Sequence, residues 1–291
     1  MIHRHRCYRQ LAWAMGLLSI WILFGCAAQK PIWGDPDSGL ILTYRAAEGG
    51  GRQYQNTITV IQDLEMMGQH MKTETKTDMG FTVASKGMDA ESHVLDVAVD
   101  TLRVEISGPQ GNRSPDTSGI TGKHFDMTLS PLGKELDVSG AAALTYETSP
   151  LTKGSLEPIF ATIFPDLPAR PVKQGDTWTS TSDTARDDGN TKINTVVQFA
   201  NVLGGPETVD GRECIKVTGE MTGTMTGKGN QMGSDFTLSG NLKGTTTWFF
   251  DYKEGALVKR ELKFTGDLKV ESAMGSMPVA LENIEETRLV Q

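Results

Sequence analysis

The chain has 291 residues, of which 28 are Lys or Arg and 36 are Asp or Glu, so its formal net charge is −8. A net negative charge argues against binding to nucleic acid and against electrostatic adhesion to an anionic membrane. Three cysteines are too few for a disulfide framework, so an apolar core must hold the fold together.

Residues 1–25 have the pattern of a secretory signal. Arg4, Arg6 and Arg9 form a basic head without acidic residues, and the apolar run LAWAMGLLSIWILFG follows. This run is too short to span a bilayer comfortably, although an uncleaved membrane anchor remains the alternative. Removal of this segment takes the net charge from −8 to −11, because it contains three basic residues and no acidic one.

The tetrad Leu23-Phe24-Gly25-Cys26 ends the apolar run and resembles the lipobox of bacterial lipoproteins. In that family the cysteine thiol, a strong nucleophile as its thiolate, receives a diacylglyceryl group and becomes the new N-terminus. Phe24 departs from the small residue that is usual there. The resemblance implies an exported protein held to a membrane by lipid on Cys26. Ala27, a residue other than Asp, implies sorting to the periplasmic face of the outer membrane.

Residues 26–39 contain several Pro and Gly residues and predict a flexible tether, followed by an antiparallel β domain at 40–291. The clearest strand is 262–271, where apolar residues alternate strictly with polar ones. Such alternation predicts antiparallel strands with one covered and one solvated face. Turn residues at 130–133, 187–190, 209–212 and 252–255 separate the strands. The expected fold is mainly β, a long meander forming a strongly curved sheet or half-barrel.

One segment, 155–164, breaks the period of two. Its apolar residues follow the spacing i, i+3, i+4, i+7 and i+8, which predicts a short amphipathic helix ending before Pro165. This helix and a Pro-rich link join the segments 40–150 and 170–291, which leaves a diverged duplication of two related halves open. The apolar positions are Leu156, Ile159, Phe160, Ile163 and Phe164.

The stretch 221–240 combines Gly, Met and Thr and admits three interpretations. The spacing from Gly223 to Lys228 is one residue short of a phosphate-binding loop, which excludes that motif. A copper site built from Met thioethers remains a minor alternative. The strand interpretation puts Met and Gly on one face and Thr on the other. With the turn at 230–233, we predict a register that places Met225 opposite Leu238 and Gly223 opposite Gly240, and a bend in the sheet at the paired glycines.

Three segments together resemble a family of uncharacterised all-β bacterial lipoproteins. They are FDMTLSPLGKELDVSG, FPDLPARPVKQGDTW and FDYKEGALVKREL, within 125–140, 164–178 and 250–262. The resemblance spans nearly the whole mature chain and implies export and a β fold, but no activity. The expected architecture is also similar to that of the lipoprotein-localisation factors, in which a curved sheet wraps an apolar cavity plugged by helices. No functional residue carries over from that analogy.

Catalytic motifs are missing from the mature sequence. Its three histidines, His70, His93 and His124, belong to no H-E-x-x-H motif, and there is no G-x-S-x-G elbow. After loss of the leader with Cys7 and modification of Cys26, the remaining cysteine is Cys214, which we expect to be a buried structural thiol. The sequence therefore predicts a protein that is not an enzyme and has no cofactor or metal.

Two functions fit these expectations. The one that the sequence favours is a non-catalytic structural or protein-interaction module of the cell envelope, and the alternative is a carrier for a lipid or another hydrophobic ligand inside the curved sheet. An enzyme or a copper-binding protein is a distant third. A packed or an open interior distinguishes the first two. The residues expected to line this core or cavity are Met221, Met225, Phe236, Leu238, Leu242, Trp248, Phe264, Ile159, Phe160 and Ile163.

Overall fold

The computed structural model describes residues 33–35, 38–47, 50–66, 68–149, 152–187, 190–231, 233–273 and 275–290. The signal segment 1–25, Cys26 and most of the tether lie outside the described residues. Within them the fold is almost entirely β, with two one-turn helices, α2 (Ser139–Ala142) and α3 (Glu157–Phe160). The strands are β1 (Gly34–Asp35), β2 (Gly39–Leu40), β3 (Arg52–Met66), β4 (Gln69–Asp89), β5 (Ser92–Gly108), β6 (Gly111–Arg113), β7 (His124–Leu129), β8 (Glu135–Asp137), β9 (Thr145–Ser149), β10 (Thr152–Ser155), β11 (Thr177–Asp187), β12 (Thr191–Val209), β13 (Arg212–Gln231), β14 (Ser234–Asp251), β15 (Ala256–Ser272) and β16 (Gly275–Leu289).

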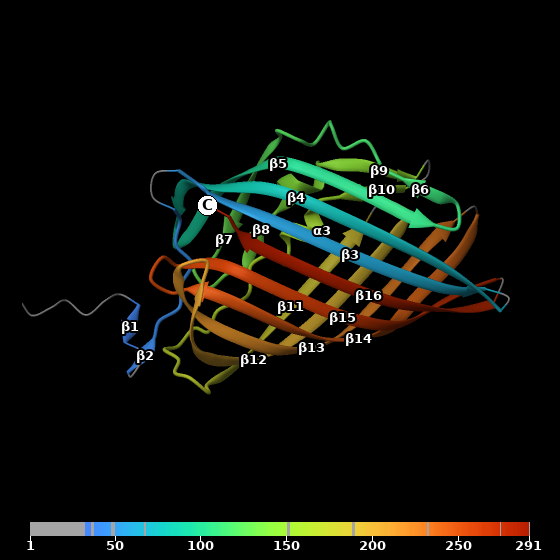
Figure 1. Cartoon of the computed structure of the whole chain (residues 1–291). Coiled ribbons are helices and arrows are strands. Elements are labelled where there is room, and N and C mark those ends of the chain that lie inside the picture. The colour runs from blue at the N-terminus through green and yellow to red at the C-terminus, as the bar shows by residue number, and fades with distance from the viewer. Residues whose placement is uncertain are drawn as a thin grey trace, which may run out of the picture.

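Twelve of these strands form a single antiparallel sheet in the order β11-β12-β13-β14-β15-β16-β3-β4-β5-β7-β8, with β6 paired to β5. The last strand of the chain, β16, pairs with β3, so the segments 40–150 and 170–291 share one sheet. Among the described residues, the edge strands β11 and β8 do not pair with each other, and the sheet stays open. The expected fold, a long antiparallel meander in a strongly curved sheet, is confirmed (Figure 1).

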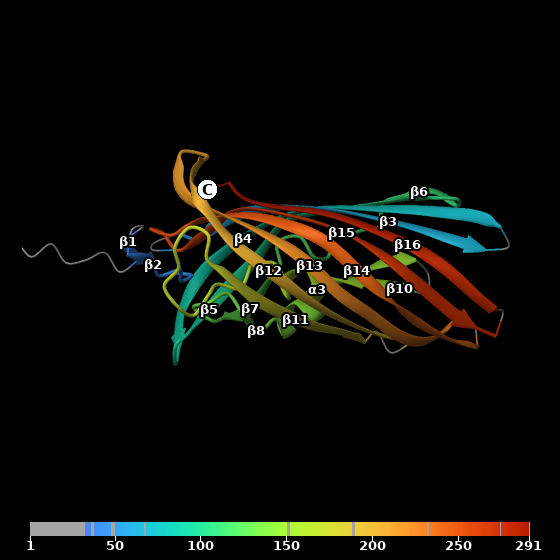
Figure 2. The same cartoon turned by 90° about the horizontal axis from the view of Figure 1, so that it is seen from below.

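The long strands give the sheet two different ends. The hairpin turns that follow β3, β5, β13 and β15 lie at one end, which we call the tip end. The turns that follow β4, β12 and β14 lie at the other, which we call the closed end. β1 and β2 lie at the closed end and β6 at the tip end in both views (Figures 1 and 2). The helix α3 lies on the concave side of the sheet, between the edge strands.

The register between β13 and β14 differs from the one predicted. Met221 pairs with Gly244, Gly223 with Leu242 and Met225 with Gly240, so that each glycine faces a large side chain instead of another glycine. The turn explains the shift of one position per strand. Gln231 pairs with Ser234, and Gly233 in the turn between them has a φ of 82°, where glycine is favoured.

Neighbouring strands nevertheless approach each other closely at the glycines of the inner face. A Cβ atom on Gly244 would lie 2.2 Å from the carbonyl oxygen of Lys263, and one on Gly240 would lie 2.3 Å from that of Asp267. On the concave face of a bent sheet, neighbouring backbones approach closely, and only glycine leaves the room that this requires. The glycines therefore permit the curvature one by one, each beside a Met or Leu.

The predicted helix at 155–164 is only one turn long. Pro158 lies in its first turn, and the helix ends at Phe160, with Ala161 as its C-cap. Beyond it, Ile163 and Phe164 are buried from an irregular loop. We call residues 156–167 the plug. Its apolar residues have helical spacing because the segment is buried on several sides, and a loop buries these side chains as well as a helix does.

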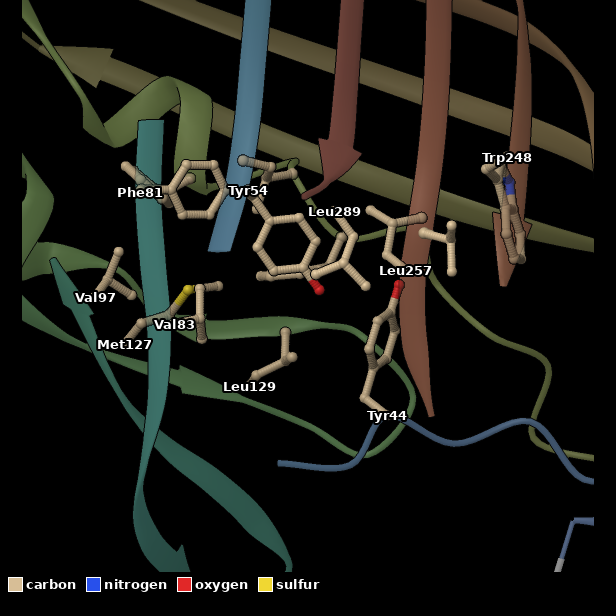
Figure 3. Packing of buried hydrophobic residues seen from close by; sticks show 14 of the residues in the cluster. Tyr44, Tyr54, Phe81, Val83, Val97, Met127, Leu129, Trp248, Leu257 and Leu289 are labelled. Carbon is tan, nitrogen blue, oxygen red and sulfur yellow. The ribbon is translucent and has the colours of Figure 1, made fainter. Parts of the chain in front are cut away.

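The main core fills the closed end. Tyr54 and Phe81 stack with ring centroids 5.3 Å apart, and Phe160 from α3 meets the ring of Phe81 edge-on at 5.1 Å. Figure 3 shows the rings of Tyr54 and Phe81 near Tyr44, Leu257 and Leu289, which come from opposite ends of the chain. Aromatic pairs of this kind add about 0.5–1.5 kcal/mol each to the burial of their area. This end of the fold is a packed core.

The segment before β3 is docked on the same end. β1 pairs with β2, Leu40 exchanges backbone hydrogen bonds with Val172, and the guanidinium of Arg45 lies 5.9 Å from the centre of the Trp33 ring. Arg45 also donates to the carbonyl of Lys253 in the turn between β14 and β15, at 2.6 Å. The described part of the expected tether is thus attached to the closed end.

Candidate functional site

The concave face of the sheet encloses a large cavity between the plug and the tip end. Its volume is about 1550 Å³, above the range of ordinary small-molecule pockets. The apolar wall comes from residues of β3, β4, β13, β14, β15 and β16, because every second side chain of a strand points to the same face. The floor is formed by α3 and the segments on either side of it. The apolar wall residues are Val60, Leu64, Met71, Met225, Phe236, Leu238, Phe264, Leu268, Val270, Met277, Val279 and Leu281.

A second, inner chamber of about 360 Å³ continues toward the closed end. It shares residues with the outer chamber, among them Val60, Met225 and Phe264. Beyond these its lining is dominated by large apolar side chains. They are Ile58, Ile159, Phe164, Val197, Phe199, Met221, Leu242, Trp248 and Leu262.

Eight of the ten residues expected to line a core or cavity line one of the two chambers. Met225 and Phe264 line both chambers, whereas Phe236 and Leu238 line only the outer one. The inner chamber adds Met221, Leu242, Trp248 and Ile159. Phe160 and Ile163 do not line either chamber, and both are fully buried in the main core. Cys26, the predicted lipid-attachment residue, lies outside the described residues.

Two carboxyl groups lie where the chambers meet. Glu135 of β8 and Asp166 of the plug loop line both chambers. Burial raises the pKa of Glu135 to about 8, although a hydrogen bond from the backbone N–H of Phe164 to Oε1 at 3.0 Å acts in the opposite direction. Burial also raises the pKa of Asp166, opposed by the positive charge of Lys134. The uncharged form of Glu135 is therefore favoured at pH 7.

Arg260 fastens the plug to the sheet. Its side chain is only 4 % exposed, and Nη1 donates to the backbone carbonyl of Thr162. The same nitrogen lies 3.7 Å from Oε1 of Glu285 on the neighbouring strand β16, and Asn56 donates to that oxygen at 3.3 Å. This cation is thus already compensated by a carboxylate and carbonyl oxygens.

The loop that carries Asp166 is held by two further bonds. The hydroxyl of Tyr44 donates to the carbonyl of Pro165 at 3.0 Å, and Nε1 of Trp178 donates to that of Asp166 at 3.2 Å. Burial raises the pKa of the Tyr44 hydroxyl well above its usual value, with a smaller contribution from nearby Tyr54. Tyr44 is therefore a permanent donor, and the floor of the cavity is a fixed surface.

One wall of the junction is polar. Ser182 and Thr184 of the edge strand β11 line both chambers, as does Thr195 of β12. Asn283 of β16 also lines both, and its buried Oδ1 has no hydrogen-bond partner among the described residues. Hydroxyl and amide groups thus face the two carboxyl groups across the cavity.

Metal-binding groups are not assembled in the described part of the chain. No three His, Cys, Asp or Glu side chains among the described residues are placed to hold a metal ion. Cys214 is fully buried and free, and burial raises the pKa of its thiol to about 12, which leaves it unreactive. None of the described helices is long and apolar enough to cross a membrane.

Sequence reasoning missed the polar residues of the junction. Arg260 carried a usable signal, because it lies two positions before Leu262 on the covered face of the same strand. A charged residue at a covered position is uncommon and indicates a specific partner. Glu135 and Asp166 lie in irregular or very short segments, where no period shows which side chains turn inward.

Comparisons with known proteins give distant matches only. No protein-family model and no curated protein matches the chain. A solved structure from Bacteroides fragilis, described as an exported protein with a YmcC-like fold, is 10% identical over 82% of this chain and 96% of its own, with a TM-score of 0.22. An outer-membrane channel from Pseudomonas putida F1 is 8% identical over 84% of this chain and 97% of its own, with a TM-score of 0.26. Similarity this low carries no conclusion about this protein.

Proposed function

We propose that this protein is a lipid-anchored binding protein of the cell envelope that holds a hydrophobic ligand on the concave face of its sheet. The observation that carries the proposal is the cavity of about 1550 Å³ with its wall of Val, Leu, Met and Phe side chains. A structural or protein-interaction module needs no such cavity, and an apolar wall left without a ligand faces water at a cost in free energy. The cavity therefore favours the carrier over the packed module.

The envelope location rests on the sequence of the N-terminus. The signal pattern at 1–25 and the lipobox at Cys26 support export and attachment to a membrane. We expect the mature protein to begin at Cys26 with lipid attached, at the periplasmic face of the outer membrane. Mass spectrometry of the N-terminal peptide from the native host checks this. A free thiol at Cys26, or a peptide that still contains the leader, would contradict the anchor without touching the cavity.

Ligand binding can be tested by filling the cavity. Thr195 points inward from β12 and lines both chambers, whereas Gln198 lies exposed three residues further along the same strand. We expect Thr195→Trp to weaken binding of the neutral apolar dye N-phenylnaphthylamine by about tenfold or more, because the indole occupies the junction and displaces the ligand. Gln198→Trp is the matched control and should bind as the unaltered protein does.

The readout is dye fluorescence on the full chain kept soluble by a non-ionic amphipol. Far-UV circular dichroism of both variants shows that the sheet is intact. An unaltered protein that binds no dye, or two Trp variants with equal affinity, would remove the carrier function.

A further inference from the structure

We propose that the junction between the two chambers binds the ammonium group of an amphiphile whose apolar tail lies in the inner chamber. This inference rests on the proposed function and assigns a ligand class to the same cavity. It starts from the polar side chains that line both chambers and so lie where the outer chamber meets the inner one.

The groups at this level are mainly hydrogen-bond acceptors. Glu135 and Asp166 contribute carboxyl oxygens from the floor, and Ser182 and Thr184 contribute hydroxyl oxygens from the edge strand. Asn283 adds a buried carbonyl oxygen that has no donor among the described residues. An ammonium group carries three N–H donors and no acceptor, so it matches a set of this kind.

The charges around the junction favour a cation. Arg260, the nearest buried cation, is neutralised by Glu285 and donates to the plug carbonyls. Lys134 lines only the outer chamber, and Tyr44 stays uncharged. Among the described residues neither Glu135 nor Asp166 forms an ion pair, so two partly buried acids line the cavity without a cation in contact. An acid that ionises in this position lacks a counterion, and a bound ammonium group supplies it.

The inner chamber fits the rest of the ligand. Its volume is about 360 Å³, within the range of a small-molecule pocket, and Ile, Leu, Met, Phe, Val and Trp side chains form most of its apolar lining. Arg260 and Glu285, which are paired with each other, line it as well. A tail placed there removes apolar surface from water on both partners, while the ammonium group remains at the acids. Neither half of the ligand alone gains both contributions.

Binding of an ammonium group should release a proton from Glu135. The groups that face this carboxyl are Asp166 on the plug loop, Arg260 on β15 and Tyr44 on the segment before β3. Because the pKa of Glu135 is raised to about 8, the acid is mostly neutral at pH 7, and a cation favours its ionised form. Affinity for an ammonium ligand should then rise by up to about tenfold per pH unit below pH 8 and level off above it.

The test compares three ligands with the same twelve-carbon tail: dodecylamine, dodecanol and dodecanoate. Each displaces N-phenylnaphthylamine from the full chain in non-ionic amphipol, below its micellar concentration, at pH 6 and pH 8. We expect dodecylamine to bind tightest at pH 8 and to lose about tenfold or more in affinity at pH 6. Dodecanol should bind equally at both pH values.

Variants separate the junction from the rest of the cavity. Glu135→Gln should abolish the pH dependence for dodecylamine and leave dodecanol binding unchanged. Glu157→Gln is the matched control, since Glu157 lines only the outer chamber. Asp166→Asn provides a second junction variant in case Glu135→Gln does not fold. It should lower the affinity for dodecylamine and leave the affinity for dodecanol unchanged.

The outcomes distinguish this inference from the proposed function. Failure of all three ligands would remove the carrier function itself. Binding of dodecanol or dodecanoate without a preference for the amine would overturn only the ammonium site. A further pair, lysophosphatidylethanolamine and lysophosphatidylglycerol, identifies the source. Preference for the ethanolamine lipid assigns a lipid headgroup, and preference confined to dodecylamine assigns a simple amine; both support the site.

Discussion

Folding removes the carboxyl group of Glu135 from water without giving it a cation in contact. Its pKa rises from 4.5 to about 8, so the folded chain binds this proton more tightly than the unfolded chain does. The stability that the proton provides is present in full below pH 4.5 and is lost as the pH rises through 8. Between these values the free energy of unfolding should fall by up to about 1.4 kcal/mol per pH unit because of this residue.

The variant Glu135→Gln isolates that effect, because glutamine has the same shape and no titration in this range. We expect the difference in unfolding free energy between the variant and the unaltered chain to grow in favour of the variant from pH 5 to pH 8. Urea unfolding at each pH measures it. Glu157→Gln, on the same floor, should show no such trend. A difference that stays constant with pH would mean that Glu135 is ionised in the folded protein.

At the scale of elements, the sequence predicts the strands, whose apolar residues alternate, and misses the details of turns and loops, which have no repeating pattern. Alternation identified the strands around 221–250 and 262–271, and with them most of the cavity wall. The register between β13 and β14 depended on where Gly233 adopts a positive φ, and a shift of one position per strand keeps every side chain on its face. The helix predicted at 155–164 is present but covers only Glu157–Phe160, because apolar spacing indicates burial, which a loop also provides.

The bend of the sheet can be tested at its glycines. Gly244→Ala places a Cβ atom 2.2 Å from the carbonyl oxygen of Lys263, so the strands must separate, and we expect a loss of about 1–3 kcal/mol in unfolding free energy. Gly205→Ala in strand β12, on the other side of β13, is the control, because its Cβ atom would meet nothing closer than 3.5 Å. It should change stability by less than about 0.5 kcal/mol. Equal losses for both variants, measured by urea unfolding, would show that curvature does not depend on close approach at Gly244.

At the scale of the whole molecule, long-range pairing places the cavity. The chain is a meander, yet its last strand β16 pairs with β3, so the middle of the sheet is formed by the two ends of the domain. No local pattern in the sequence predicts the pairing of β16 with β3, since strands with the same alternation can pair in many orders. The positions of the plug and of the polar residues at the junction also depend on contacts between residues far apart in the sequence. The sequence therefore predicted the wall residues better than the floor.

The two ends of the sheet also have a direction relative to the proposed anchor. Six residues separate Cys26 from Trp33, so their reach is at most about 25 Å. Trp33 contacts Arg45, which donates to the turn between β14 and β15, and these groups lie at the closed end. β4, with 21 residues, covers about 70 Å between the ends. A lipid on Cys26 therefore holds the closed end near the membrane and directs the cavity opening away from it.

This orientation predicts unequal distances from the bilayer. Glu254 lies exposed at the closed end and Asn112 at the tip end, so Glu254→Cys and Asn112→Cys can each carry a fluorescent donor, because Cys214 is fully buried. With the lipidated full chain in vesicles that contain an acceptor lipid, we expect strong energy transfer from position 254 and weak transfer from position 112. Equal or reversed transfer would contradict it. In the expected orientation the proposed ligand would enter and leave the cavity on the side away from the anchoring bilayer, since that bilayer would face the packed core.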